Sequence, residues 1–236
     1  MRLNKYLARC GLGSRRKCDS FIEQGLIKIN GKRIKDFSIK VSQNDFVQFK
    51  NRILNFVEEN YLYIVNKPRG YVSTLDDPKG RKKVIDLIDS NIRLFNIGRL
   101  DYNSTGLILF TNNGDISNIL LRPENKLIKK YYVETDGKLS KDDIFLIKKG
   151  FKIPDFGMVK ADISFLESAK KEYYIWDVKL TEGKNREIKR IFSYFDISVN
   201  KLHRYEFAGI KLGNIKSGKY KRISFKQIEN IVTLKK

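Results

Sequence analysis

Residues 98–114 read GRLDYNSTGLILFTNNG. The apolar run 107–110 within this stretch predicts a buried strand. Asp101 lies in the polar, glycine-bounded loop directly before that strand, where a rigid scaffold often holds functional side chains. An aspartate in such a loop is also a common turn or cap residue, so the residue type alone leaves both interpretations open.

The segments around this stretch predict an α+β domain over residues 61–236. Strand-like patterns occur at 61–65, 107–111, 130–133 and 173–180. Helix-like patches lie between them, at 83–90, 115–121, 141–149 and 187–195. Because this order is not a regular alternation of strand and helix, we expect a mixed, largely antiparallel β-sheet flanked by helices.

The first 50 residues predict a separate, smaller domain that begins with two helices. Leu3, Tyr6 and Leu7 follow helical spacing, and the first helix ends near Gly11. Ser14 is a candidate N-cap for the second helix, since its hydroxyl can accept a hydrogen bond from the backbone of the first turn.

A small sheet follows these helices. The residues on both sides of Asn30-Gly31 predict a hairpin, because an Asn-Gly pair supplies the positive φ angles of a type I′ turn. An alternating pattern over 41–49 predicts a further strand, and the polar segment 51–60 predicts a linker to the larger domain.

The charge of the chain favours a polyanionic partner. Its 236 residues include 48 Lys+Arg against 27 Asp+Glu, a net charge of +21. A lysine-rich composition can also reflect the bias of a genome, so the distribution matters more than the total. Residues 2–17 contain no acidic residue, and their basic residues are candidate RNA contacts. They are Arg2, Lys5, Arg9, Arg15, Arg16 and Lys17.

The composition also argues against several classes of protein. No apolar run approaches the roughly twenty residues of a membrane-spanning helix, and no secretory signal is visible, so we expect a cytoplasmic protein with no membrane partner. Two cysteines without a CxxC pair argue against a disulfide scaffold or a zinc knuckle. A single histidine, His203, is too little for a His-based metal site, and we expect no metal.

The N-terminal pattern resembles the RNA-binding module named after ribosomal small-subunit protein four. The matching segments are 2–7, 13–16 and 25–32. The resemblance implies that the two helices present a basic face to structured RNA. A basic helical cap with no RNA role is the alternative.

Four ordered segments of the larger domain resemble the motifs of ribosomal RNA pseudouridine synthases. They are 66–74, the stretch 98–114, 129–133 and 180–190, followed by a closing pattern from 199 onward. The sequence of residues 182–190 most resembles that of the RluB-like members of the RsuA/RluB-like family, which act on large-subunit ribosomal RNA.

This resemblance assigns roles to three residues. It implies that Asp101 is the nucleophile or base, that Tyr131 is the active-site tyrosine, and that Lys189 pairs with Asp101. Without the motifs, Tyr131 could equally be a packing residue between strands and Lys189 a solvated lysine on a helix. Ser104 stands where the family usually has Thr, and we expect its hydroxyl to replace the hydrogen bond of that Thr.

The same resemblance implies an isomerase that needs no cofactor and turns a uridine of ribosomal RNA into pseudouridine. Arg99, Arg186 and Arg190 are further candidate RNA contacts. We expect a monomer that binds ribosomal RNA or a partly assembled ribosomal particle, with 23S RNA as the target. The alternatives are a synthase acting on 16S RNA and a non-enzymatic, RNA-binding ribosome-assembly factor.

Overall fold

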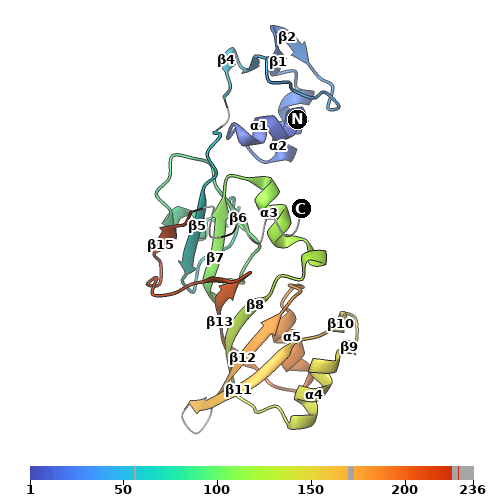
Figure 1. Cartoon of the computed structure of the whole chain (residues 1–236), viewed down its shortest axis with the longest axis vertical. Helices are drawn as coiled ribbons and strands as arrows, with labels where there is room; N and C mark the ends of the chain where they lie inside the picture. The colour runs from blue at the N-terminus through green and yellow to red at the C-terminus, as the bar shows by residue number, and fades with distance from the viewer. Residues whose placement is uncertain (56, 170–172, 225–227, 229–236) are drawn as a thin grey trace. The chain divides into compact units, whose positions relative to one another are not determined.

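The computed structural model of the chain describes residues 1–55, 57–169, 173–224 and 228. The chain divides into two compact units (Figure 1). Unit 1 comprises Met1–Asn60 with Asn91–Arg93, and unit 2 comprises Tyr61–Ser90 with Leu94–Lys236. Among the described residues, no helix is both long and apolar enough to cross a membrane.

Unit 1 contains two helices and a four-stranded antiparallel sheet in the order β2-β1-β3-β4. Its elements are α1 (Leu3–Arg9), α2 (Arg15–Glu23), β1 (Ile27–Ile29), β2 (Lys32–Ile34), β3 (Val47–Phe49) and β4 (Arg52–Ile53). The Ser14 hydroxyl accepts a hydrogen bond from Lys17 N at 3.2 Å, which confirms the predicted N-cap of α2. Asn30 and Gly31 both have positive φ, 50° and 80°, so the predicted hairpin turn is confirmed.

Two segments of unit 1 differ from the sequence-based expectation. The strand predicted over 41–49 is only β3, because the Asp45 carboxylate accepts a hydrogen bond from Ser42 N at 2.8 Å and closes a turn ahead of it. The segment 51–60, predicted as a linker, contains β4, which pairs with β3. Leu54 is buried there, and its carbonyl accepts a hydrogen bond from the Tyr6 hydroxyl at 2.9 Å.

Unit 2 is built on a nine-stranded sheet, whose main path is β11-β12-β8-β13-β7-β5-β15. β6 pairs with β7 and β14 with β13 at its sides. The strands are β5 (Leu62–Lys67), β6 (Phe95–Ile97), β7 (Thr105–Thr111), β8 (Lys129–Thr135), β11 (Asp162–Ala169), β12 (Tyr173–Leu180), β13 (Val199–Phe207), β14 (Ile210–Lys211) and β15 (Tyr220–Arg222). All pairs are antiparallel except β13 with β7, so the sheet is mixed and largely antiparallel, as predicted.

Helices and a small hairpin flank this sheet (Figure 1). They are the 3₁₀ helices η1 (Val84–Leu87) and η2 (Pro123–Asn125), the helices α3 (Gly114–Leu121), α4 (Lys141–Lys149) and α5 (Glu187–Tyr194), and the hairpin of β9 (Phe151–Ile153) with β10 (Gly157–Val159). The helix predicted at 83–90 is only η1, since Lys83 forms a β-bridge with Val72 and Ile88 is already extended.

β7 lies between two hydrophobic clusters, which explains its uninterrupted apolar run. Leu107 and Leu109 belong to the cluster on one face of the strand, and Ile108 and Phe110 belong to the cluster on the other. All four side chains are buried. A strand covered on both faces needs apolar residues at successive positions rather than at alternate ones.

The parallel contact of β7 with β13 requires glycine at position 106. Gly106 lies opposite Arg204 in the strand register and has a φ of 99°. A Cβ atom at this position would lie 2.3 Å from the Arg204 carbonyl oxygen, and neither backbone could give way without leaving the sheet. Gly106 therefore lets the two strands approach at the point where the loop carrying Asp101 enters the sheet.

Candidate active site

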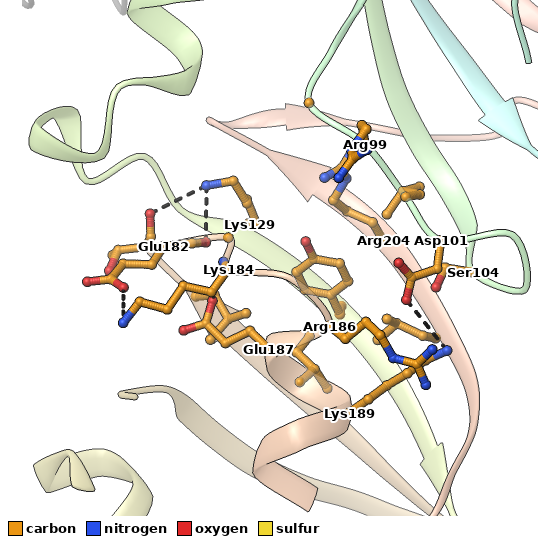
Figure 2. A pocket seen from close by; sticks show the side chains of 18 of the residues that line it. Arg99, Asp101, Ser104, Lys129, Glu182, Lys184, Arg186, Glu187, Lys189 and Arg204 are labelled. Atoms are coloured by element: carbon orange, nitrogen blue, oxygen red, sulfur yellow. Dashed lines mark hydrogen bonds and ion pairs between the residues drawn. The ribbon is translucent and has the colours of Figure 1, made fainter. Parts of the chain in front are cut away.

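Unit 2 contains a cavity of about 520 Å³, within the size range of small-molecule and cofactor sites. The loop before β7, the start of β8, the loop that leads into α5, α5 itself and β13 contribute to its walls. Figure 2 shows charged side chains of both signs around this space. The cavity brings together segments that are more than a hundred residues apart in the chain, since its lining runs from Gly98 to Arg204, and they include parts of the motifs 98–114, 129–133 and 180–190.

Asp101 and Lys189 meet at one side of this cavity (Figure 2). The Lys189 ammonium nitrogen lies 3.6 Å from Asp101 Oδ2. The Asp101 side chain is 39% exposed and that of Lys189 20% exposed, so the carboxylate has an open side. Lys189 can stabilise the negative charge of Asp101 at the cavity wall. The exposed side of the carboxylate leaves room for a substrate.

A buried ammonium group holds the backbone around Asp101 through hydrogen bonds to its carbonyl groups. Lys67, at the end of β5, is fully buried and donates hydrogen bonds to the carbonyls of Pro68 at 3.1 Å, Tyr102 at 3.2 Å and Ser104 at 2.6 Å. Two of these three acceptors follow Asp101 in its loop. Lys67 is thus a positioning residue for the loop.

Burial lowers the pKa of the Lys67 ammonium from its ordinary value of 10.5 to about 8, and the negative charge of Asp101 partly opposes this shift. Lys67 lies in the motif 66–74, but the motif alone predicts no role for it. The available signal was a lysine at the end of an otherwise apolar strand, where an ammonium needs buried acceptors.

Ser104 does not make the hydrogen bond that the sequence analysis expects. Its hydroxyl is buried and has no hydrogen-bond partner among the residues that the structure describes. Its backbone does connect the loop, since Ser104 N donates to the Asp101 carbonyl at 3.0 Å.

Tyr131 is buried at the cavity wall and lies on β8. The register places it opposite Val178 of β12 and Arg204 of β13. Because both neighbouring strands hold it, the aromatic ring offers a fixed apolar surface to whatever enters. The structure therefore brings Asp101, Tyr131 and Lys189 to one cavity, as their motif positions suggest.

Arg204 is a further wall residue to which the sequence analysis gave no role. It is buried, and its Nε donates to the Leu107 carbonyl at 2.7 Å. Its guanidinium lies over the Phe207 ring, 5.2 Å from the centroid. Nη2 has no hydrogen-bond partner within the described part of the chain, so a positive charge stands beside the cavity.

The loop ahead of α5 sets the direction of Lys189. Arg186 precedes the helix in the left-handed conformation, with a φ of 54°. The face formed by Ile188, Ile191 and Phe192 is buried in the core, which fixes the rotation of the helix. Lys189 lies next to this face, at the cavity.

The candidate RNA contacts fall into three groups. Arg99 and Arg186 are exposed and line the cavity. Arg190 is exposed, but its guanidinium lies 4.6 Å from the centroid of the Phe156 ring, on the hairpin side of α5. The remaining six lie on or beside α1 and α2 in unit 1, where Lys5 and Arg9 are half-buried and the others exposed. These six are Arg2, Lys5, Arg9, Arg15, Arg16 and Lys17.

Comparison with known families matches both units. The model of the RNA pseudouridylate synthase family matches residues 61–194, and that of the S4 domain matches residues 1–47. The similarity to single proteins extends over nearly the whole chain.

An uncharacterised RNA pseudouridine synthase of Rickettsia typhi is 37% identical over 99% of this chain and 96% of its own length. The ribosomal large subunit pseudouridine synthase B of Bacillus subtilis is 32% identical over 99% of this chain and 96% of its own. The dual-specificity RNA pseudouridine synthase RluF of Salmonella typhi is 35% identical over 99% of this chain and 79% of its own length. A crystal structure of a pseudouridylate synthase superimposes with a TM-score of 0.68 at 26% identity, covering 98% of this chain and 99% of the other.

The buried Lys67 ammonium should make stability depend on pH in a way that Lys67→Met removes. The folded protein releases this proton near pH 8, whereas the unfolded chain keeps it until about 10.5. Between these values the unfolded state binds more protons, so the free energy of unfolding of the wild type should rise relative to that of Lys67→Met, by at most about 1.4 kcal/mol per pH unit. Urea unfolding from about pH 8 to about pH 10 measures this difference.

The matched control is Lys82→Met, which removes an exposed lysine of the same unit. The difference in free energy of unfolding between Lys82→Met and the wild type should stay constant from about pH 8 to about pH 10. Parallel pH profiles for the wild type and Lys67→Met would contradict the assignment of a depressed pKa to Lys67.

Proposed function

This chain belongs to the RNA pseudouridylate synthase family, and we propose that it isomerises a uridine of 23S ribosomal RNA with Asp101 as the catalytic nucleophile or base. The enzyme class follows from the family: the protein is an isomerase that forms pseudouridine in RNA. The observation that carries the assignment of Asp101 is its ion pair with Lys189 in a cavity that Tyr131 also lines.

The reaction is an exchange of one bond for another on the same base. The bond from uracil N1 to ribose C1′ breaks, the base turns, and C5 bonds to C1′. C5 loses a proton and N1 gains one, so no atom or electron is left over. The reaction thus requires a carboxylate at the ribose, a surface that holds the free base, and a group that transfers a proton from C5.

The described residues match these three needs. The carboxylate of Asp101 faces the open side of the cavity, and Lys189 stabilises its charge when a base excludes water. The ring of Tyr131 supplies a surface on which the extruded uracil can stack, and its hydroxyl is a candidate for the proton transfer. Extruding a stacked uridine costs a few kcal/mol. Phosphate contacts from Arg99 and Arg186 at the cavity help to offset this cost.

Two observations support ribosomal RNA as the substrate. Unit 1 matches the S4 domain, and its helices carry the cluster of basic residues from Arg2 to Lys17. The relative from Bacillus subtilis bears the name of a large-subunit pseudouridine synthase. On this basis we propose 23S RNA, free or in a partly assembled particle, as the substrate.

We extend the proposal to the oligomeric state and the cellular location of the enzyme. We propose that the enzyme acts as a monomer. Modification of ribosomal RNA during assembly would take place in the cytoplasm. Sedimentation of the purified protein and fractionation of cells test these two points.

Asp101→Asn should abolish isomerisation, because an amide keeps the shape of the carboxylate but supplies neither a nucleophile nor a base. Isomerisation releases the hydrogen at C5, so tritium release from RNA labelled at uracil C5 measures it. We expect the variant to be slower by about a thousandfold or more, with an unchanged unfolding midpoint. Asp142→Asn makes the same change on exposed α4 and should keep the wild-type rate. Full tritium release by Asp101→Asn would refute the assigned role.

The target can be identified by mapping pseudouridines in a strain that lacks the protein. At least one uridine of 23S RNA should stay unmodified, and wild-type protein should restore it whereas Asp101→Asn should not. Loss of a pseudouridine from 16S or transfer RNA alone would show that the target is wrong while the enzyme class stands. Complete ribosomal pseudouridine in the deletion strain, together with no tritium release in vitro, would favour a role in ribosome assembly.

A further inference from the structure

Glu187 is a buried carboxylate in the cavity that the proposed reaction does not use. The residue is 3% exposed and lines the cavity. One oxygen, Oε2, accepts a hydrogen bond from Lys184 N at 3.0 Å, and Glu187 N donates back to the Lys184 carbonyl at 3.2 Å. The other oxygen, Oε1, has no hydrogen-bond partner among the described residues. A buried carboxylate oxygen without a donor is costly, and a site that binds a polyanion makes it more so.

The place of Glu187 separates it from the reacting centre. Figure 2 shows its carboxylate beside Lys184, on the opposite side of the cavity from Asp101 and Lys189. Glu187 precedes Lys189 by two positions on α5, and side chains two positions apart leave a helix in different directions. Glu187 therefore lies in the same cavity as Asp101 and Lys189 but apart from that pair.

The charged groups around Glu187 are engaged with other acceptors and do not donate to its buried free oxygen. The Lys129 ammonium donates to the carbonyls of Thr181 at 3.4 Å and Glu182 at 3.2 Å. The Lys184 ammonium pairs with the Glu182 carboxylate at 2.8 Å. Burial raises the pKa of the Glu187 carboxyl, Glu182 raises it further, and the bond from Lys184 N and the charges of Lys184 and Lys129 oppose the shift. None of these groups donates to Oε1.

We propose that Glu187 is a specificity residue that accepts a hydrogen bond from the exocyclic amino group of the base next to the target uridine. Adenine, guanine and cytosine present such a group, and uracil does not, so a carboxylate at this position discriminates among neighbours. A phosphate at the same place would be repelled. This inference rests on the proposed function, since it takes the RNA strand to pass Asp101 and Glu187 together.

Glu187→Gln is the discriminating variant. Its carbonyl oxygen can still accept the bond from Lys184 N, so the loop ahead of α5 keeps its closure. The other atom becomes an NH₂ donor, which cannot accept from a base amino group. Glu187→Ala is the harsher comparison, because it removes the bond to Lys184 N as well. Thermal unfolding of the full-length variants shows whether each is folded.

The experiment measures the binding of short RNAs with a central uridine to the full-length wild type and to Glu187→Gln. One flanking nucleotide is varied at a time. The first pair of RNAs has adenosine or purine riboside at that position, and the second pair has guanosine or inosine, so that the two RNAs of each pair differ by a single amino group. At one flanking position the wild type should bind the amino-bearing RNA about tenfold more tightly. Glu187→Gln should show no such difference. Tritium release from the same RNAs, labelled at the central uracil, reports the reaction separately.

The outcomes distinguish the two proposals. Equal discrimination by the wild type and by Glu187→Gln would overturn the role of Glu187, whether or not the RNA reacts. Loss of discrimination only when the flanking ribose lacks its 2′-hydroxyl would also overturn it, because the bond would then come from the sugar. Discrimination that depends on Glu187 without any tritium release would support base reading and count against the proposed reaction.

Discussion

Two strands that meet at Gly106 and Arg204 hold the catalytic unit together. The parallel contact of β7 with β13 joins the strands β11, β12 and β8 to the strands β5 and β15 in one sheet. The loop with Asp101 precedes β7, whereas Tyr131 lies on β8, beyond that contact, and Lys189 on α5. Without the close approach that Gly106 allows, the strand that follows the Asp101 loop and the strand that carries Tyr131 would belong to separate sheets. The cavity is thus a consequence of one tight backbone contact.

Charge in this cavity is balanced locally although the chain as a whole is strongly basic. Lys189 faces Asp101, and the Lys67 ammonium lies below the same loop, bound to its carbonyls. Around Glu187 the cations are already engaged with acceptors. The net charge of +21 attracts RNA without regard to sequence. A few carboxylates inside the cavity can then carry the chemistry and the choice of substrate.

Residues with a strong local pattern were predictable from the sequence. The ranges of α4 and β12 agree with the structure, because their periodicity is undisturbed. Asp101, Tyr131 and Lys189 were identified through their motifs, and the structure places them together. The sequence analysis did not predict β13, whose charged residues interrupt its apolar pattern. The partners of these residues lie on β8, as in the pairs Lys201–Glu134 and Lys130–Glu206.

The hydrogen-bond partners of Lys67 and Glu187 could not be predicted, since each depends on burial that only tertiary packing creates. Lys67 reaches the Asp101 loop because β5 and β7 pair in the register that sets it opposite Gly106. Glu187 closes a turn with its own side chain, which accepts the hydrogen bond from Lys184 N. A motif shows that such positions matter, but it does not show which atoms they face.

We propose that Lys189 makes Asp101 competent by stabilising its charge inside a covered cavity. The most direct measurement is the single-turnover rate of Lys189→Met and Lys189→Arg at saturating RNA. The ion pair predicts that Lys189→Met is slower by about tenfold or more with little change in RNA affinity, and that Lys189→Arg keeps most of the rate. A wild-type rate for Lys189→Met, or a loss confined to RNA affinity, would contradict it.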